Sequence, residues 1–145
     1  MSFFPLASKR PLDFGFLVDS SSDISSNNWQ RILWYMRNVI DGLQNISPQP
    51  YGTRVGIVSY ASVPRMHFDF NFLWGPNLNK ERLKGLVNSL YRQPGSDRKI
   101  DNAVDFTREN LFSLRGGARP NSRRVRKTNR LTFFVFFFFV CDTLF

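Results

Sequence analysis

Residues 13–18 form a short, nearly all-apolar run that ends abruptly in a cluster of oxygen-bearing side chains. The run reads DFGFLV, and the next residues, Asp19 to Ser25, read DSSSDIS. A run of this length without polar alternation is typical of a strand that is buried on both faces of a parallel sheet. The sequence therefore predicts an α/β protein whose first strand delivers carboxylates and hydroxyls to one edge of the sheet.

The rest of the chain alternates between helical and extended patterns. Apolar residues recur at helical spacing at Trp29, Ile32, Leu33, Met36, Val39, Ile40, Leu43 and Ile46. We predict helices over 25–46, 80–90 and 100–112, and further strands over 54–61 and 66–70. A proline just before the last strand places that strand in a hairpin or at an edge. The order predicts a Rossmann-like, doubly wound, mostly parallel sheet with one antiparallel edge strand, in a three-layer α/β sandwich.

The oxygen cluster has two interpretations. In open α/β sheets, ligands bind just beyond the carboxyl ends of the strands, which is where Asp19 stands. Hard divalent cations take oxygen ligands, and Mg²⁺ combines one or two carboxylates with water molecules. Asp19 and the hydroxyls after it are therefore candidates for a metal site. In the other interpretation, Asp19, Ser20 and Ser21 satisfy loop backbone groups and Ser25 caps the first helix.

The net charge of +9 is concentrated near the end of the chain. Seven of the twenty basic residues fall within residues 115–130, where there is no acidic residue. Such a block is most often a solvated loop, and the alternative is an anionic partner such as nucleic acid, a sulfated glycan or lipid headgroups. We expect no nucleic-acid partner because no nucleic-acid-reading motif is present. We expect no membrane insertion because no apolar run reaches about 20 residues. The single cysteine, Cys141, excludes an internal disulfide.

Three segments in this order, FGFLVDSSSDIS, RVGIVSYAS and AVDFTRENLF, closely resemble the von Willebrand factor type A domain. The resemblance covers residues 11–125, and we interpret residues 1–10 as an N-terminal extension. It implies an extracellular protein-binding module without a catalytic role, as in matrilins and type VI collagen. The implied partner is a protein of the extracellular matrix or the cell surface. Members of the family often bind it through a metal-ion-dependent adhesion site, which implies Mg²⁺ or Mn²⁺.

The first metal-binding motif of that family is partly present. In the family, the first strand ends in Asp-x-Ser-x-Ser, and the resemblance implies that Asp19 and Ser21 correspond to its Asp and first Ser. Asp23 replaces the second Ser. The motif therefore keeps two of its three ligands and adds a second carboxylate.

The second metal-binding motif departs further from the family pattern. Arg98 falls where the family has a metal-coordinating Thr, directly after Ser96 and Asp97. A guanidinium has no lone pair to give a metal. In one interpretation the loop shifts, so that Ser96 or Asp97 serves as a ligand and the metal survives. In the interpretation that we favour, Arg98 pairs with Asp19 and Asp23 and takes the place of the cation.

Residues 126–145 are rich in phenylalanine and match no part of the family. The family continues at this point with a strand whose Asp completes the metal site. We interpret the segment as non-family sequence of the kind that a translated intron would give, which leaves the domain incomplete. In the alternative, FFFFVCD is a poor fourth strand with Asp142 in the place of that Asp. Without a fourth strand, the first strand has an open apolar edge, and we expect low solubility and marginal stability.

Two other functions compete with a binding module. An enzyme on a doubly wound sheet would be expected to carry a phosphate-binding Gly-x-Gly-x-x-Gly, a P-loop or a Gly-x-Ser-x-Gly elbow, and the sequence has none of them. The single histidine, His67, is expected to be a strand residue rather than a catalytic base. The remaining hypothesis is a truncated product without independent function.

Overall fold

The computed structural model describes residues 11–47, 49–72 and 78–120. The predicted N-terminal extension and the predicted Phe-rich segment, residues 126–145, lie outside the described residues. Within the described residues, no helix combines the length and the apolar character that crossing a membrane requires.

The sheet has three strands in the order β1-β2-β3. β1 (Leu12–Asp19) runs parallel to β2 (Thr53–Tyr60), and β3 (Pro64–Phe68) pairs with β2 in the antiparallel direction. All but the first residue of β1 are buried, and all but the second residue of β2 are buried. The mostly parallel sheet with an antiparallel edge strand confirms the predicted fold class.

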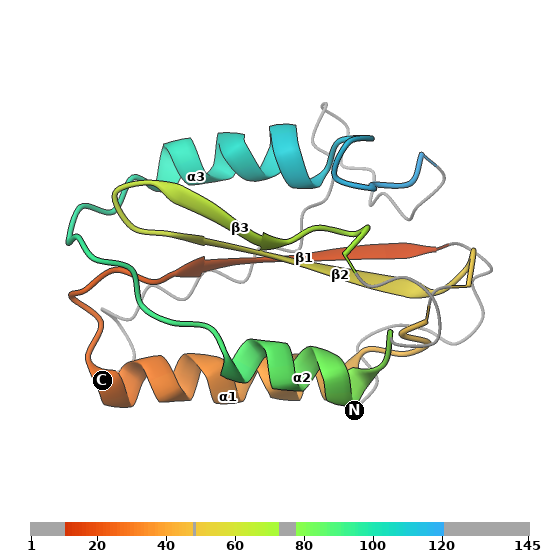
Figure 1. The fold of residues 1–145 in the computed structure, drawn as a ribbon, viewed down its shortest axis with the longest axis horizontal. Coiled ribbons are helices and arrows are strands. Elements are labelled where there is room, and N and C mark those ends of the chain that lie inside the picture. The colour runs from red at the N-terminus through yellow and green to blue at the C-terminus, as the bar shows by residue number, and fades with distance from the viewer. Residues whose placement is uncertain (1–10, 48, 73–77, 121–145) are drawn as a thin grey trace, which may run out of the picture.

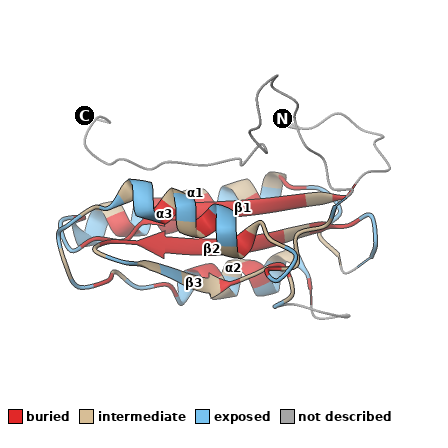
Figure 2. Ribbon diagram, turned by 90° about the horizontal axis from the view of Figure 1, so that it is seen from above, coloured by how far each residue is buried: buried red, intermediate tan, exposed pale blue. Residues whose placement is uncertain are grey.

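Helices cover both faces of the sheet (Figure 1). α1 (Ser26–Gly42) and α2 (Lys80–Asn88) lie on one face, and α3 (Ile100–Phe106) lies on the other. α3 continues directly into a π-helical turn, η2 (Thr107–Leu111). The layers are helix, sheet and helix, and burial is concentrated on the strands and on the inner sides of the helices (Figure 2).

The larger apolar core lies between α1, α2 and the sheet. The Ser25 hydroxyl accepts a hydrogen bond from the Asn28 N–H and so begins α1, as an N-cap serine does. The inner face of α1 then supplies buried residues at helical spacing, namely Trp29, Ile32, Leu33, Met36 and Ile40. α1 ends at Gly42, earlier than the predicted end at 46, because the Leu43 N–H closes the last turn onto Val39 and Ile40 carbonyls. Leu43 is nevertheless buried in the core.

β3 begins two residues earlier than predicted, at Pro64 instead of 66, and ends at Phe68 instead of 70. Pro64 is the first residue of this edge strand and pairs in register with Tyr60. A proline is tolerated there because its missing N–H weakens no central ladder. The prediction of an edge position was therefore right, whereas the boundaries were shifted.

Two strand glycines determine how closely η2 approaches the sheet. Gly15 and Gly56 are register partners on β1 and β2. A Cβ on Gly56 would lie 2.4 Å from Leu111 Cδ1, and a Cβ on Gly15 would lie 2.8 Å from a ring carbon of Phe112. Leu111 is fully buried and has little room to move. Because these two glycines have no side chains, Leu111 and Phe112 at the end of the third helix can pack directly against the sheet.

Arg119 closes the end of the sheet at which β1 and β2 begin. Its Nε donates to Asp13 Oδ1 at 2.8 Å, and its backbone N–H donates to Asp13 Oδ2 at 2.7 Å. A terminal nitrogen also donates to the carbonyls of Leu12 and Gly52, at 2.9 and 2.8 Å. The expectation that the basic block is a solvated loop was wrong for this residue, whose side chain is 11% exposed. The exposed Arg115 fits that expectation.

The close packing of Leu111 on Gly56 can be tested by its effect on stability. Replacement of Gly56 by Ala is expected to lower the free energy of unfolding by about 1–3 kcal/mol, because the added methyl overlaps the buried Leu111. Gly85→Ala in α2 is the matched control, since nothing lies within 4 Å of its added Cβ. That change is expected to raise the stability by about 0.5–1 kcal/mol. Urea unfolding of the 145-residue chain measures both, and unchanged stability in Gly56→Ala would contradict the close packing.

Candidate functional site

The candidate site is the rim of the sheet at the carboxyl ends of β1 and β2, where the loops over residues 20–25, 61–63 and 91–99 meet. Asp19, the last residue of β1, is 2% exposed. Its Oδ1 accepts a hydrogen bond from the Ser21 backbone N–H at 2.9 Å. The chain therefore turns directly after the strand and buries one carboxylate beneath the loop that leads to α1.

The loop between α2 and α3 brings a cation to this carboxylate. Arg98 Nε lies 3.4 Å from Asp19 Oδ2, and a terminal nitrogen of Arg98 lies 3.8 Å from Asp23 Oδ2. One guanidinium therefore lies between two carboxylates. Asp19 has the greater need of a countercharge, because it is buried whereas Asp23 is half exposed. The neighbouring Tyr60 adds no charge at neutral pH. Burial raises the pKa of Tyr60 to about 12, and Asp19 acts in the same direction while Arg98 opposes it.

The other residues of the predicted site lie apart from this contact. Asp97 pairs with Lys99 at 3.5 Å, and its side chain is 61% exposed. Ser96 is exposed on the same loop. In this structure Arg98 is thus the member of the predicted trio that faces Asp19. Asp142 lies outside the described residues.

The two buried hydroxyls beside Asp19 differ in their hydrogen bonding. Ser20 Oγ donates to the Tyr60 carbonyl at 3.2 Å and accepts from Gln93 Nε2 at 3.0 Å. Ser21 Oγ is equally buried but makes no hydrogen bond with any described residue. A buried hydroxyl without a partner is destabilising. Ser20 therefore has a structural role, whereas the Ser21 hydroxyl is buried without a hydrogen-bond partner among the described residues.

The described rim places a guanidinium where a divalent cation would lie. The described residues contain no group of three or more His, Cys, Asp or Glu side chains that could hold a metal. The Ser21 oxygen and the Asp19 carboxylate would suit Mg²⁺ or Mn²⁺. Arg98 lies against that same carboxylate, however, and a guanidinium has no lone pair and repels a cation.

Gln93 is a rim residue that sequence reasoning missed. Its backbone N–H donates to the Ser20 carbonyl at 2.7 Å. Its Nε2 donates to Ser20 Oγ at 3.0 Å and to Ser59 Oγ at 2.8 Å. Ser59 Oγ lies 2.7 Å from His67 Nε2. Burial lowers the pKa of His67, and Arg65 lowers it further. The sequence offered one signal for this contact, namely Ser59, a small polar residue inside the apolar run of β2.

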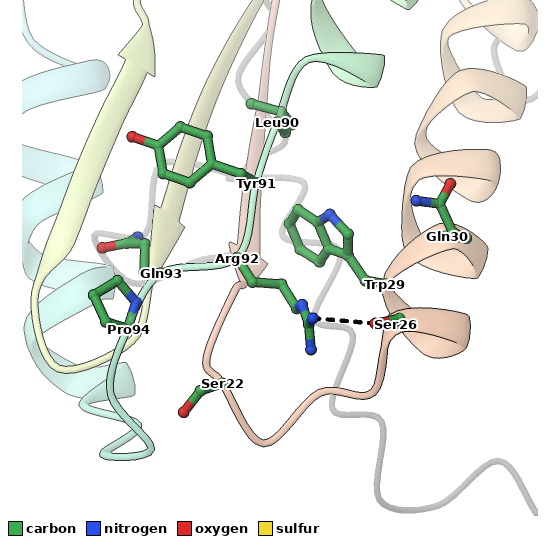
Figure 3. Close-up of a pocket in the computed structure, with 9 residues that line it drawn as sticks. All are labelled: Ser22, Ser26, Trp29, Gln30, Leu90, Tyr91, Arg92, Gln93 and Pro94. Carbon is green, nitrogen blue, oxygen red and sulfur yellow. Dashed lines mark hydrogen bonds between the residues drawn. The ribbon is translucent and has the colours of Figure 1, made fainter.

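A pocket opens beside the rim, between the start of α1 and the segment that follows α2 (Figure 3). Its volume is about 700 Å³. Trp29 comes from α1, and Tyr91 and Arg92 come from the opposite segment. The Arg92 guanidinium donates to Ser26 Oγ at 3.1 Å and so connects the two sides.

A mostly parallel sheet with helices on both faces and polar loops at its strand ends defines an open α/β protein with its binding edge at the rim. The sequence profile of the von Willebrand factor type A domain matches residues 13–126, and the chain belongs to this family.

The relatives are proteins of the extracellular matrix and of cell adhesion. Collagen alpha-4(VI) chain of Mus musculus is 30% identical over 111 residues, which are 77% of this chain and 4% of that protein. Matrilin-2 of Mus musculus is 29% identical, over 79% of this chain and 11% of that protein. Integrin alpha-X of Mus musculus is 28% identical, over 81% of this chain and 9% of that protein. The chain thus spans only a small part of the length of these relatives.

Solved structures share the fold at lower identity. Proximal thread matrix protein 1 from the mussel byssus superposes with a TM-score of 0.70 at 22% identity, over 78% of this chain and 29% of that one. Another structure of that protein, described as having a zinc-occupied MIDAS motif, gives a TM-score of 0.65 at 20% identity, over 79% of this chain and 27% of that one. These likenesses support the fold.

The contrast between the two serines can be tested by removing each hydroxyl. We expect Ser20→Ala to lower the free energy of unfolding by about 1–2 kcal/mol, because it breaks the contacts with Gln93 and the Tyr60 carbonyl. Ser21→Ala is expected to leave the stability unchanged or to raise it, because its hydroxyl has no described partner. Chemical unfolding of both variants measures the difference. Equal losses in the two variants would show that the Ser21 hydroxyl has a structural role after all.

Proposed function

We propose that the chain is the N-terminal portion of a type A domain that binds a protein ligand at the rim, with Arg98 in place of the metal ion. The observation that carries the proposal is the position of the Arg98 guanidinium, 3.4 Å from the buried Asp19 and 3.8 Å from Asp23. The adhesion site of this chain is accordingly a degraded one, in which Arg98 instead of a metal ion neutralises Asp19 and Asp23.

The charge balance supports this assignment. A carboxylate buried to the extent of Asp19 needs a countercharge, because an unpaired buried ion is strongly disfavoured. A divalent cation would supply it in a metal-dependent site. Here Arg98 supplies it, and the second carboxylate, Asp23, occupies the outer side of the same guanidinium. Both departures from the family motif act together, since the added acid and the added base compensate each other.

The relatives support the kind of partner and the location. Matrilins, collagen VI and integrin alpha-X point to a protein ligand in the matrix or on the cell surface, and to an extracellular location. Binding rather than catalysis is the role that we propose. We also propose that residues 126–145 are not part of the domain, which sequencing of the transcript beyond the codon for Val125 would test. An intact messenger RNA that spans the phenylalanine run would oppose that boundary.

Binding to matrix proteins with and without metal tests the proposed function. Surface plasmon resonance of the 145-residue chain over immobilised collagens and fibronectin is expected to show saturable binding to at least one of them. The affinity is expected to be the same in EDTA and in excess Mg²⁺, because Arg98 already fills the place of the cation.

Arg98→Ala is expected to weaken that binding by at least about tenfold, since it leaves Asp19 without a countercharge and loosens the rim. Arg108→Ala is the matched control, because Arg108 pairs with Asp105 on the exposed surface of the third helix. It should bind like the unaltered chain. Binding that requires Mg²⁺, or no binding to any of the immobilised proteins, would contradict the proposal.

A further inference from the structure

The pocket beside the rim has walls that differ in chemistry. Trp29, Leu90 and Pro94 give it apolar surface, whereas Ser26, Gln30 and Arg92 contribute polar groups. It lies at the same end of the sheet as the Asp19–Arg98 contact, because the segment that lines it is the start of the loop that carries Arg98.

The charge of Arg92 is not balanced within the described residues. Among the residues that line the pocket it is the only charged one. Its guanidinium donates to the Ile24 carbonyl and to Ser26 Oγ, which are both neutral acceptors. No ion pair joins it to a carboxylate in the described ranges, in contrast to Arg98, Arg108 and Arg119. The first turn of α1, against which it lies, contains no acidic residue either.

Tyr91 precedes Arg92 on the same segment, and its exposed ring points to the opposite side of that segment, toward Arg65 and His67 of β3 (Figure 3). The residue is 53% exposed. The Arg65 guanidinium donates to its hydroxyl, and Arg65 Cζ lies 5.6 Å from the ring centre. The His67 ring meets it edge to face at 6.3 Å. A ring fixed in this way loses little conformational freedom when a ligand covers it, as binding surfaces require.

We propose that this pocket binds an acidic side chain of the protein ligand, with its carboxylate paired to Arg92 and the adjoining apolar residues packed against Trp29 and Pro94. The inference rests on the proposed function, because it names the chemistry of the ligand for the same rim. A single guanidinium matches a single carboxylate. A sulfated glycan or a nucleic acid would need several cations in a row, which the described lining does not offer.

A matched pair of peptides tests the pocket directly. The probes are the blocked peptides acetyl-Ala-Leu-Glu-Leu-Ala-amide and its Gln counterpart, titrated into the ¹⁵N-labelled 145-residue chain. We expect the Glu peptide to shift the Trp29 indole N–H signal saturably. We expect the Gln peptide to bind at least about tenfold more weakly, and raised salt to weaken the Glu peptide, because the contact is an ion pair. Equal binding of the two peptides, or binding of neither, would overturn the proposal.

Variants of the arginine locate the contact. Arg92→Met is expected to abolish the difference between the two peptides, and Arg92→Lys is expected to retain part of it. The Lys variant also guards against misfolding, because it keeps the charge that faces Ser26. Arg82→Met in the exposed first turn of α2 removes the same charge away from the pocket and is expected to change nothing. An equal loss in Arg82→Met and Arg92→Met would refute a specific contact.

Failure of this inference differs from failure of the proposed function. If a matrix protein binds in EDTA and Arg92→Met binds it as well as the unaltered chain does, the pocket assignment is wrong and the binding module stands. If no matrix protein binds while the Glu peptide still discriminates, the pocket assignment stands and the proposed partner class is wrong.

Discussion

The ion pair between Asp19 and Arg98 is the contact on which the rim of this sheet depends. β1 ends in a carboxylate that is 2% exposed, and the strand cannot deliver it there without a countercharge. The Ser21 N–H provides one hydrogen bond to the carboxylate, and the guanidinium provides the charge. The carboxylate of Asp19 therefore connects the first strand to the turn after it and to the loop before α3.

Backbone hydrogen bonds place Arg98 at that position. The Ser22 N–H donates to the Gly95 carbonyl at 3.0 Å, and the Lys99 N–H donates to the Ala61 carbonyl at 3.3 Å. Gly95 has a φ of 107°, a left-handed conformation that favours glycine, and a Cβ there would lie 2.6 Å from Ser62 Oγ. The loop is thus attached to one neighbouring loop just before Arg98 and to the other just after it, and α3 starts directly behind.

The parts of the structure that follow from local pattern were predictable from the sequence. The apolar run of β1, the stripe of α1 and the proline of β3 led to the observed elements. The approach of Arg98 to Asp19 was expected from the resemblance to the type A domain, which places Arg98 where the family has a metal-coordinating Thr. The π-helical end of the third helix and the shifted ends of α1 and β3 arise from packing that a periodic pattern does not contain. Gln93 and Arg119 gained their roles from partners far away in the chain, and no local spacing revealed them.

Calorimetric titration of Mn²⁺ into the 145-residue chain tests most directly whether a guanidinium has replaced the metal. We expect no saturable heat up to about 10 mM, a concentration above the range of extracellular divalent sites. Asp19→Ala and the exposed Asp105→Ala should then give the same flat titration as the unaltered chain. Saturable binding that disappears in Asp19→Ala and persists in Asp105→Ala would contradict the account, because it would place a metal where Arg98 is found.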